Sequence, residues 1–203
     1  MHSLFPINHK AGLLVDCCYH TVSKFLANWL ASLQPIADVA CTCHKDSVDH
    51  YFGLLDNTRT FTPNTIVVVK YSDSKSLYFD NHLHQYEPQS DNSKLCHALG
   101  VNTCYLHYDH LPTSPFFQSA IFSRYWHDGT EVRHRYVSCI KDSSWVFRQS
   151  GSTLPFEHID RYSQRRIKDR MNCSTLLDYA LHAGYDLTDL NDLTSYYLIR
   201  HNP

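Results

Sequence analysis

Residues 118–149 read QSAIFSRYWHDGTEVRHRYVSCIKDSSWVFRQ, and this stretch decides the fold. It holds runs of aromatic and β-branched residues, separated by Asp128-Gly129 and by a polar turn at residues 141–144. A two-residue Asp-Gly loop is the strongest short-range hairpin signal, because both of its central residues need positive φ angles. The stretch therefore predicts a three-stranded antiparallel meander at the centre of the sheet, whose third strand is at residues 145–148.

The Asp-Gly loop also predicts the register of the first hairpin. If Asp128 and Gly129 are the loop residues, His127 pairs with Thr130, and the other pairs follow from the strand geometry. The predicted pairs are Trp126–Glu131, Tyr125–Val132, Arg124–Arg133 and Phe122–Arg135. Arg124 then lies opposite Arg133, which is destabilising, and Glu131 is the one nearby charge that offsets the pair.

Because side chains alternate between the faces of a strand, this register sorts the meander into two faces. A register error of one residue would exchange them. The predicted core face carries Ile121, Tyr125, Val132, Tyr136, Ile140, Trp145 and Phe147. The other face carries four arginines and two large aromatic rings, in the set Phe122, Arg124, Trp126, Glu131, Arg133, Arg135, Val137, Val146 and Arg148.

A sheet face that mixes arginine with aromatic rings is typical of proteins that bind single-stranded nucleic acid. Guanidinium groups contact phosphates there, and the rings stack on bases. Two structural interpretations remain open beside this one. The face could be a solvated surface with arginine stems lying over the rings, or a helix could cover it and pair its carboxylates with the arginines.

Composition predicts a globular protein, and the expected strands and helices together predict the α+β class. The chain has 203 residues, with 43% hydrophobic and 19% charged residues, which is enough for one large domain with a real core. We expect a single domain over residues 1–203, and a boundary, if there were one, at residues 111–117 between the proline-marked segment and the meander. Neither of the glycine-rich phosphate-binding motifs is present.

The basic charge is concentrated in the meander and in the segment after it. The net charge of the chain is −2. Residues 118–170 hold 10 Lys/Arg against 6 Asp/Glu, whereas residues 1–117 hold 7 against 10 and residues 171–203 hold 1 against 4. A local basic surface on a mildly acidic protein suits an anionic partner, either nucleic acid or an acidic protein surface.

Hydrophobic periodicity predicts the remaining elements. Residues 17–34 form an amphipathic core helix that Asp16 could cap and Pro35 ends. Strands are expected at residues 12–15, 65–71, 76–80 and 101–108, a short helix at 47–55 and a long loop at 81–94. Near the C-terminus we expect helices at residues 158–171, 175–183 and 189–199, the second of them capped by Ser174.

The predicted helix at residues 158–171 extends the basic patch. Arg161, Arg165 and Lys168 form one stripe on its helical wheel. Arg166 and Arg170 fall within its apolar arc, where they must pair with the protein's own carboxylates or meet an anionic partner. The candidate binding residues are therefore Phe122, Trp126, Arg124, Arg133, Arg135, Arg148, Arg161, Arg165 and Lys168.

Two segments could offer metal ligands, although we expect no cofactor. Cys41, Cys43 and His44 could bind zinc, but their spacing is not one of the usual structural forms. His82 and His84 would lie on one side of an extended segment, or in a solvated loop. A metal-dependent hydrolase is thus one alternative function, without a motif that selects its residues.

The other alternative is a protein-interaction module, such as an inhibitor encoded by a mobile element that blocks a host defence complex. Tyrosine and arginine are enriched at interface hot spots, so the same patch would serve it. We expect a cytoplasmic protein, because the N-terminus lacks the pattern of a signal peptide, no apolar run has the length of a membrane span, and eight cysteines suit a reducing compartment.

Overall fold

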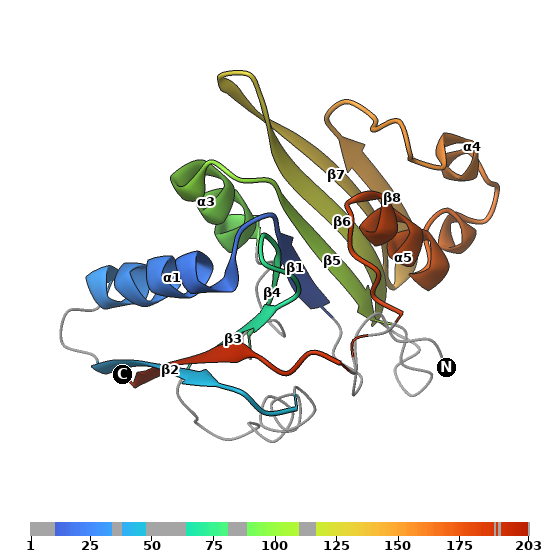
Figure 1. Cartoon of the computed structure of the whole chain (residues 1–203). Helices are drawn as coiled ribbons and strands as arrows, with labels where there is room; N and C mark the ends of the chain where they lie inside the picture. Colours follow the sequence, from blue (N-terminus) through green and yellow to red (C-terminus); the bar gives the residue numbers. More distant parts are fainter. Residues whose placement is uncertain are drawn as a thin grey trace.

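The computed structural model describes residues 11–33, 38–47, 64–80, 89–109, 117–188, 190 and 192–202. These residues form a nine-stranded antiparallel sheet with helices on both faces, an α+β architecture (Figure 1). The strand order is β2-β9-β3-β4-β1-β5-β6-β7-β8. The strands are β1 (Ala11–Val15), β2 (Asp38–His44), β3 (Asn64–Lys70), β4 (Ser76–Asp80), β5 (Thr103–Asp109), β6 (Phe117–Asp128), β7 (Glu131–Asp142), β8 (Ser144–Ser150) and β9 (Tyr196–Asn202).

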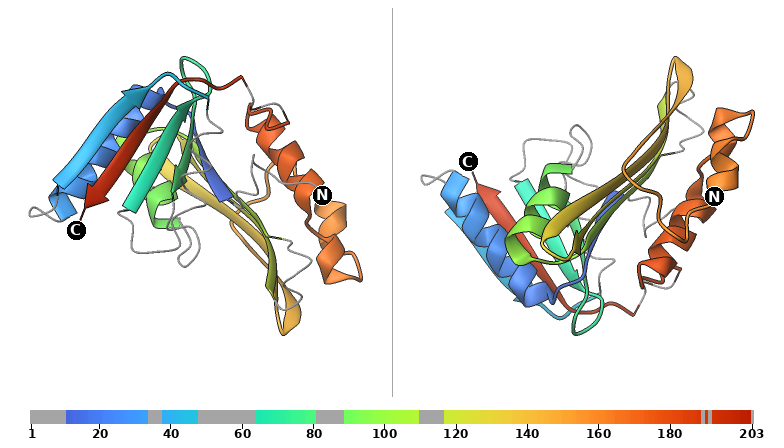
Figure 2. Two further views of the ribbon diagram at one scale, coloured as in Figure 1. Left: turned by 90° about the horizontal axis from the view of Figure 1, so that it is seen from below. Right: turned by 90° about the horizontal axis from the view of Figure 1, so that it is seen from above.

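The helices lie in two layers, one on each face of the sheet (Figure 2). On one face, Val22 and Leu26 of α1 (Tyr19–Leu33) and Leu95 of α3 (Gln89–Leu99) share a core with strand residues such as Tyr105. On the other face, α5 (Cys173–His182) packs Leu176 onto β6 and β7, beside the single turn α4 (Ile159–Tyr162) and the 3-10 turn η2 (Ile167–Asp169). This second layer covers one face of the meander, whereas Val146 and Arg148 of β8 are exposed on the other face.

The N-terminal elements agree with the sequence predictions. The strands β1, β3, β4 and β5 and the core helix α1 all form where the patterns place them. The helix begins at Tyr19, however, and Asp16 does not cap it. The carboxylate of Asp16 instead accepts hydrogen bonds from the Tyr185 hydroxyl at 3.1 Å and from the Asn102 side-chain amide at 3.2 Å. Of the helices in the described residues, none is long and apolar enough to cross a membrane.

The meander of β6, β7 and β8 forms, but at one end of the described sheet and not at its centre. The predicted register of its first hairpin is wrong by two residues. Asp128 pairs with Glu131, so the loop residues are Gly129 and Thr130, and glycine takes the positive φ of 64°. Arg124 consequently lies opposite Arg135, and Trp126 lies opposite Arg133. An even shift leaves the two faces of β6 and β7 as predicted.

The faces of β8 are exchanged relative to the prediction. The connection from β7 has a single residue between paired positions, Ser143 with a φ of 60°, so β8 begins at Ser144. Phe147 therefore pairs with Cys139, and Trp145 shares its face, under the layer that contains α5. Arg148 pairs with Ser138 and points to the opposite face from Arg135.

Three predictions near the C-terminus and one in the middle need correction. The expected helix at residues 158–171 is replaced by the two short turns α4 and η2. In place of the expected helix at 189–199, the described residues before Tyr196 are loop, and β9 then begins at Tyr196. β9 lies between β2 and β3 in the sheet. The expected loop at 81–94 contains the start of α3. α5 forms as predicted, but its cap is Asn172, whose side chain accepts from the Thr175 amide. The expected helix at 47–55 lies outside the described residues, except for Ser47, which is not helical.

Candidate nucleic-acid interface

Arg135 is the most deeply buried charged residue of the predicted patch. It is 1% exposed, and its guanidinium pairs with Glu157, with 2.7 Å between Nη2 and Oε2. Its Nη1 donates to the carbonyls of Ser150 and Gly151 at 3.1 and 3.0 Å. Burial lowers the pKa of Arg135, but the hydrogen bonds and charge of Glu157 outweigh it, and the pKa is raised overall. Arg135 is therefore an internal cation that no partner can reach.

Glu157 completes this buried centre. One of its oxygens accepts from the Leu154 amide at 2.8 Å, and the other accepts from the Tyr162 hydroxyl at 2.9 Å. The Tyr162 hydroxyl also lies 2.8 Å from that of Tyr179 on α5. Burial, together with these contacts, raises the pKa of Tyr162. The network joins β7 to α4 and α5. This agrees with the interpretation in which the arginine-bearing face is covered and its arginines pair with the protein's own carboxylates.

Phe122 and Arg124 belong to the same covered region. Phe122 is 0% exposed, and its ring packs edge-on against Tyr179 with 5.1 Å between centroids. Arg124 is half-buried, and its guanidinium lies 5.7 Å from the centroid of the Phe156 ring, within the range of a cation–π contact. The structure thus places both residues under the loop before α4.

The remaining sheet candidates are spread over the hairpin. Arg133 is exposed, but it forms ion pairs with Glu131 at 3.0 Å and with Asp128 at 3.4 Å. Trp126, opposite it, is half-buried. Arg148 is exposed on the other face of the sheet. The four arginines are thus not brought together on one open surface.

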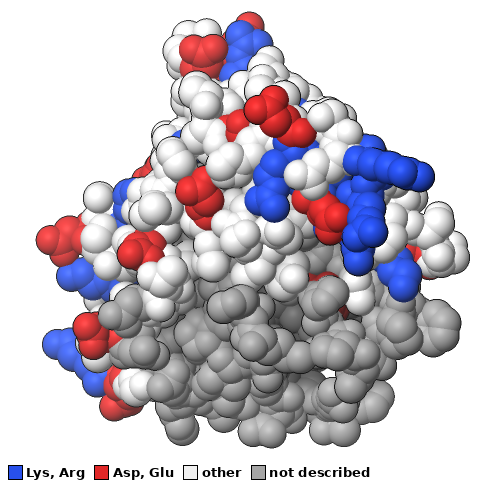
Figure 3. Space-filling view, turned by 90° about the vertical axis from the view of Figure 1, so that its right-hand side faces the viewer, with Lys and Arg blue, Asp and Glu red and all other residues white. Residues whose placement is uncertain are grey.

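A different group of cations is brought together, in the turn between α4 and η2 and in η2 itself. Arg165, Arg166 and Lys168 are exposed, and we call these three residues the basic turn. Within the part of the chain that the structure describes, none of their side chains has a hydrogen bond or an ion pair. On the face shown in Figure 3, where the right-hand side of Figure 1 faces the viewer, the larger group of Lys and Arg side chains lies on the right, with Asp and Glu side chains beside it.

The two neighbouring arginines of this segment hold it in place. Arg161 donates to the Thr175 hydroxyl at 2.8 Å. Arg170 donates to the carbonyl of Gln164 at 2.9 Å, and its guanidinium lies 5.3 Å from the centroid of the Phe147 ring. Of the predicted stripe, Arg161 is therefore used in an internal hydrogen bond, whereas Arg165 and Lys168 are exposed.

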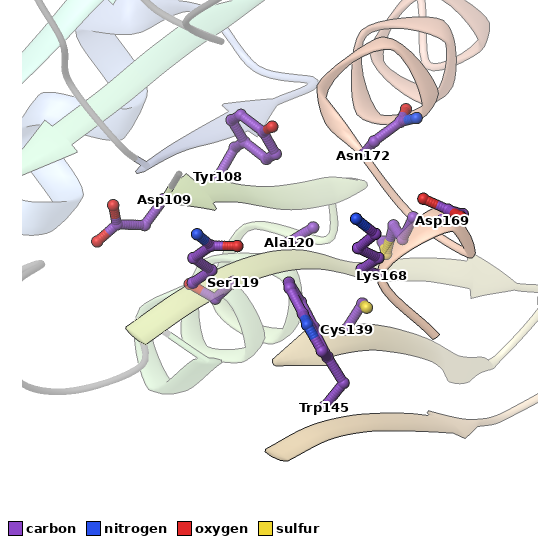
Figure 4. Close-up of a pocket in the computed structure, with 11 residues that line it drawn as sticks. Tyr108, Asp109, Ser119, Ala120, Cys139, Trp145, Lys168, Asp169 and Asn172 are labelled. Atoms are coloured by element: carbon purple, nitrogen blue, oxygen red, sulfur yellow. The ribbon is translucent and has the colours of Figure 1, made fainter. Parts of the chain in front are cut away.

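A pocket of about 220 Å³ opens beside the basic turn, between η2 and residues of four strands, β5, β6, β7 and β8. Its floor includes Ala120 and Cys139, and Figure 4 shows Trp145 and Lys168 directed toward it from β8 and from η2. Burial raises the pKa of Cys139 to about 11, and its thiol donates to the Ile167 carbonyl at 3.1 Å, which holds η2 against the sheet. Polar side chains at the pocket are Tyr108, Asp109, Gln118, Ser119, Lys168, Asp169 and Asn172, so two carboxylates line it beside the single lysine.

Sequence reasoning missed most of this pocket. Trp145 was expected in a core, and neither Gln118 nor Asn172 stands in a motif. The residues come from β5, β6, β7, β8 and the segment around η2, and they are brought together by the strand order and by the face that β8 presents. Asn172 had one readable signal, because asparagine is a preferred N-cap residue and it precedes a predicted helix.

The metal candidates of the described chain lie on β2, an edge strand of the described sheet. Cys41 and Cys43 are exposed, and His44 stacks on Tyr196, with its Nε2 2.7 Å from the Thr42 hydroxyl. Among the residues that the structure describes, no group of three or more His, Cys, Asp or Glu side chains is arranged to hold a metal ion. His82 and His84 lie outside those residues.

Comparisons with known proteins were made with family models, with curated proteins and with solved structures. No family model, no curated protein and no solved structure matches this chain.

Proposed function

We propose that this chain is a non-enzymatic binding protein that contacts nucleic acid, free or within a nucleoprotein complex, through the basic turn. The observation that carries the proposal is the group of three exposed cations, Arg165, Arg166 and Lys168, without internal partners in the described structure. Exposed cations that serve no internal contact are available to the phosphates of a nucleic-acid backbone. The buried Arg135 and the ion-paired Arg133 are not part of this proposed surface.

The charge distribution supports a local contact. The chain has a net charge of −2, so a polyanion is not attracted to the molecule as a whole. Attraction must come from the basic turn, in which only Ile167 separates Arg166 from Lys168. Single-stranded nucleic acid suits such a short contact, because its flexible backbone can bring successive phosphates to one turn. An acidic protein surface offers the same charges, and a partner of that kind is an outcome that the test below distinguishes.

We also propose that the protein works in a reducing compartment, the cytoplasm. All eight cysteines lie in the described residues, and none of them forms a disulfide. Free thiols are stable where glutathione and thioredoxin keep them reduced.

The test is fluorescence anisotropy of labelled single-stranded and duplex oligonucleotides across a salt series. The variant Arg165→Glu/Arg166→Glu/Lys168→Glu is compared with the wild type. Each phosphate contact on a single strand contributes about −0.7 to the slope of log affinity against log salt. We expect salt-dependent binding by the wild type, and a slope smaller in magnitude by about 2 in the variant.

The matched control is Lys24→Glu/Lys45→Glu/Arg148→Glu, which reverses three exposed cations elsewhere. It changes the net charge by the same amount, so a specific contact predicts that it binds almost as the wild type does. Equal weakening by the two triple variants would show a general charge effect and contradict the proposed surface. Absence of wild-type binding at low salt would also contradict it, and a pull-down with the basic-turn variant as control would then search for an acidic protein partner.

A further inference from the structure

The pocket and the basic turn are continuous, because Lys168 belongs to both. We propose that the pocket takes the base of one unpaired nucleotide, while the basic turn holds the adjacent phosphates. This inference rests on the function proposed above and adds to it the class of group that is recognised, namely an aromatic heterocycle that carries a phosphate.

The first argument is the combination of Trp145 with Lys168. Figure 4 shows the indole and the lysine side chain directed toward the same cavity, beside Ala120 and Cys139. Trp145 is half-buried on β8, so part of its ring stays accessible. An aromatic side chain next to a cation provides the two contacts that single-strand binding uses, stacking on the base and neutralisation of the phosphate.

The second argument is unused hydrogen-bonding capacity around the pocket. The side-chain amide of Gln118 and the carboxylate of Asp169 have no hydrogen-bond partner within the described chain. The Asn172 side chain uses its oxygen to cap α5, with 3.0 Å to the Thr175 amide, and its amino group has no partner there. Amides and carboxylates are the groups that read the donor and acceptor edges of bases.

The third argument is size. The pocket volume of about 220 Å³ lies below the ~300–1,000 Å³ of sites for drug-sized ligands, so it suits one ring system and not an extended molecule. Ala120, Cys139, Trp145 and Met171 give the pocket apolar surface, and polar side chains of the same lining are available to orient a bound ring. A larger partner would have to remain outside the pocket and insert one group into it, as a nucleic-acid strand does when it inserts one unstacked base.

The experiment compares one labelled single-stranded oligonucleotide with its abasic counterpart of equal length, which keeps every phosphate. We expect the wild type to bind the base-containing strand about 5- to 150-fold more tightly, the range for one base–aromatic stack. Trp145→Leu should lose this difference and keep its affinity for the abasic strand and its salt slope. Trp145→Phe should retain much of the difference, because it keeps a ring.

Two further variants keep the inference falsifiable. Trp126→Leu removes a half-buried tryptophan at the hairpin, away from the pocket, and should leave the base preference unchanged. Gln118→Ala should reduce the base preference without changing abasic binding. This variant tests the inference independently if circular dichroism shows that Trp145→Leu is misfolded. Equal wild-type affinity for the two strands would overturn the inference, and so would a base preference that is unchanged in both Trp145→Leu and Gln118→Ala. In either case, salt-dependent binding would still support the basic turn. Binding of neither strand would overturn both proposals.

Discussion

Arg135 and the arginines of the basic turn are the same residue type in opposite settings. Arg135 is 1% exposed and satisfied by Glu157 and three oxygens of residues 149–151. Arg165 and Arg166 are exposed, and no described residue satisfies them. The difference follows from one carboxylate, Glu157, which the loop after β8 carries back over the sheet. An arginine beside aromatic rings in a sequence therefore does not by itself indicate a binding surface.

The largest change in stability is expected when Glu157 loses its charge, and this change tests the comparison most directly. Glu157→Gln leaves the buried Arg135 cation without its counter-charge, and we expect the free energy of unfolding to fall by about 3–5 kcal/mol. Urea denaturation followed by circular dichroism measures it. Glu131→Gln is the control, because its ion pair with Arg133 is exposed and should contribute at most about 1 kcal/mol. Similar losses in the two variants would mean that burial does not separate these arginines.

The second effect concerns Gly151, whose carbonyl accepts from Arg135. Its φ is 78°, and a β-carbon there would lie 2.0 Å from the carbonyl oxygen of His134. Gly151→Ala must strain or move two backbone segments, so we expect a loss of about 2–4 kcal/mol. At the exposed hairpin tip, Gly129 has a φ of 64° and open space around it, and Gly129→Ala should cost only about 1 kcal/mol. A loss no larger for Gly151 than for Gly129 would contradict the buried contact.

A smaller effect should come from His134, which neighbours Arg135 in sequence and lies on the opposite face of β7. Burial lowers its pKa below 6.5, while its ring stacks on Tyr125 with 4.1 Å between centroids. The unfolded chain therefore binds the proton first as the pH falls, and stability decreases from about pH 6.5 downward to the folded-state pKa. His134→Gln should show a weaker decrease between pH 7 and 5. An unchanged pH dependence in urea titrations would contradict this.

The smallest effect on stability is expected at the basic turn. Arg165→Glu/Arg166→Glu/Lys168→Glu should change the free energy of unfolding by no more than about 0.5 kcal/mol per residue, because the three side chains have no contacts to lose within the described structure. The same urea titration tests it. A loss comparable to that of Glu157→Gln would assign these cations a structural role and remove the contrast with Arg135.

Local patterns predicted much of the fold. The hydrophobic runs of β3 and α1 and the Asp-Gly signal each act over a few residues, and those elements form. A helix was expected over β9 because Leu190, Leu193, Tyr197 and Leu198 follow a helical spacing, although Tyr196, Tyr197, Leu198 and Ile199 are also a short apolar run. A short apolar run does not separate a buried strand from a buried helix. α3 was missed because its first turns are polar, although Leu95 and the side chain of Asn92 are buried.

The candidate site was less accessible to sequence reasoning. Which face β8 presents depends on one residue, Ser143, whose positive φ no pattern indicated. The pairing of Arg135 with Glu157 joins residues from a strand and a distant loop, and the choice among several carboxylates is made by tertiary packing. The sequence analysis placed the basic turn in one helix over residues 158–171, whereas α4 ends at Tyr162 and leaves Arg165 and Arg166 in the turn before η2.

The place of β9 has a consequence for how the chain is made. β9 lies between β2 and β3 and pairs with both, so β2 has no other neighbour in the described sheet. During synthesis, β2 and β3 leave the ribosome long before β9 does, and β2 must wait with exposed backbone groups until residues 196–202 emerge. The nascent chain therefore exposes an unpaired strand until residues 196–202 have been made.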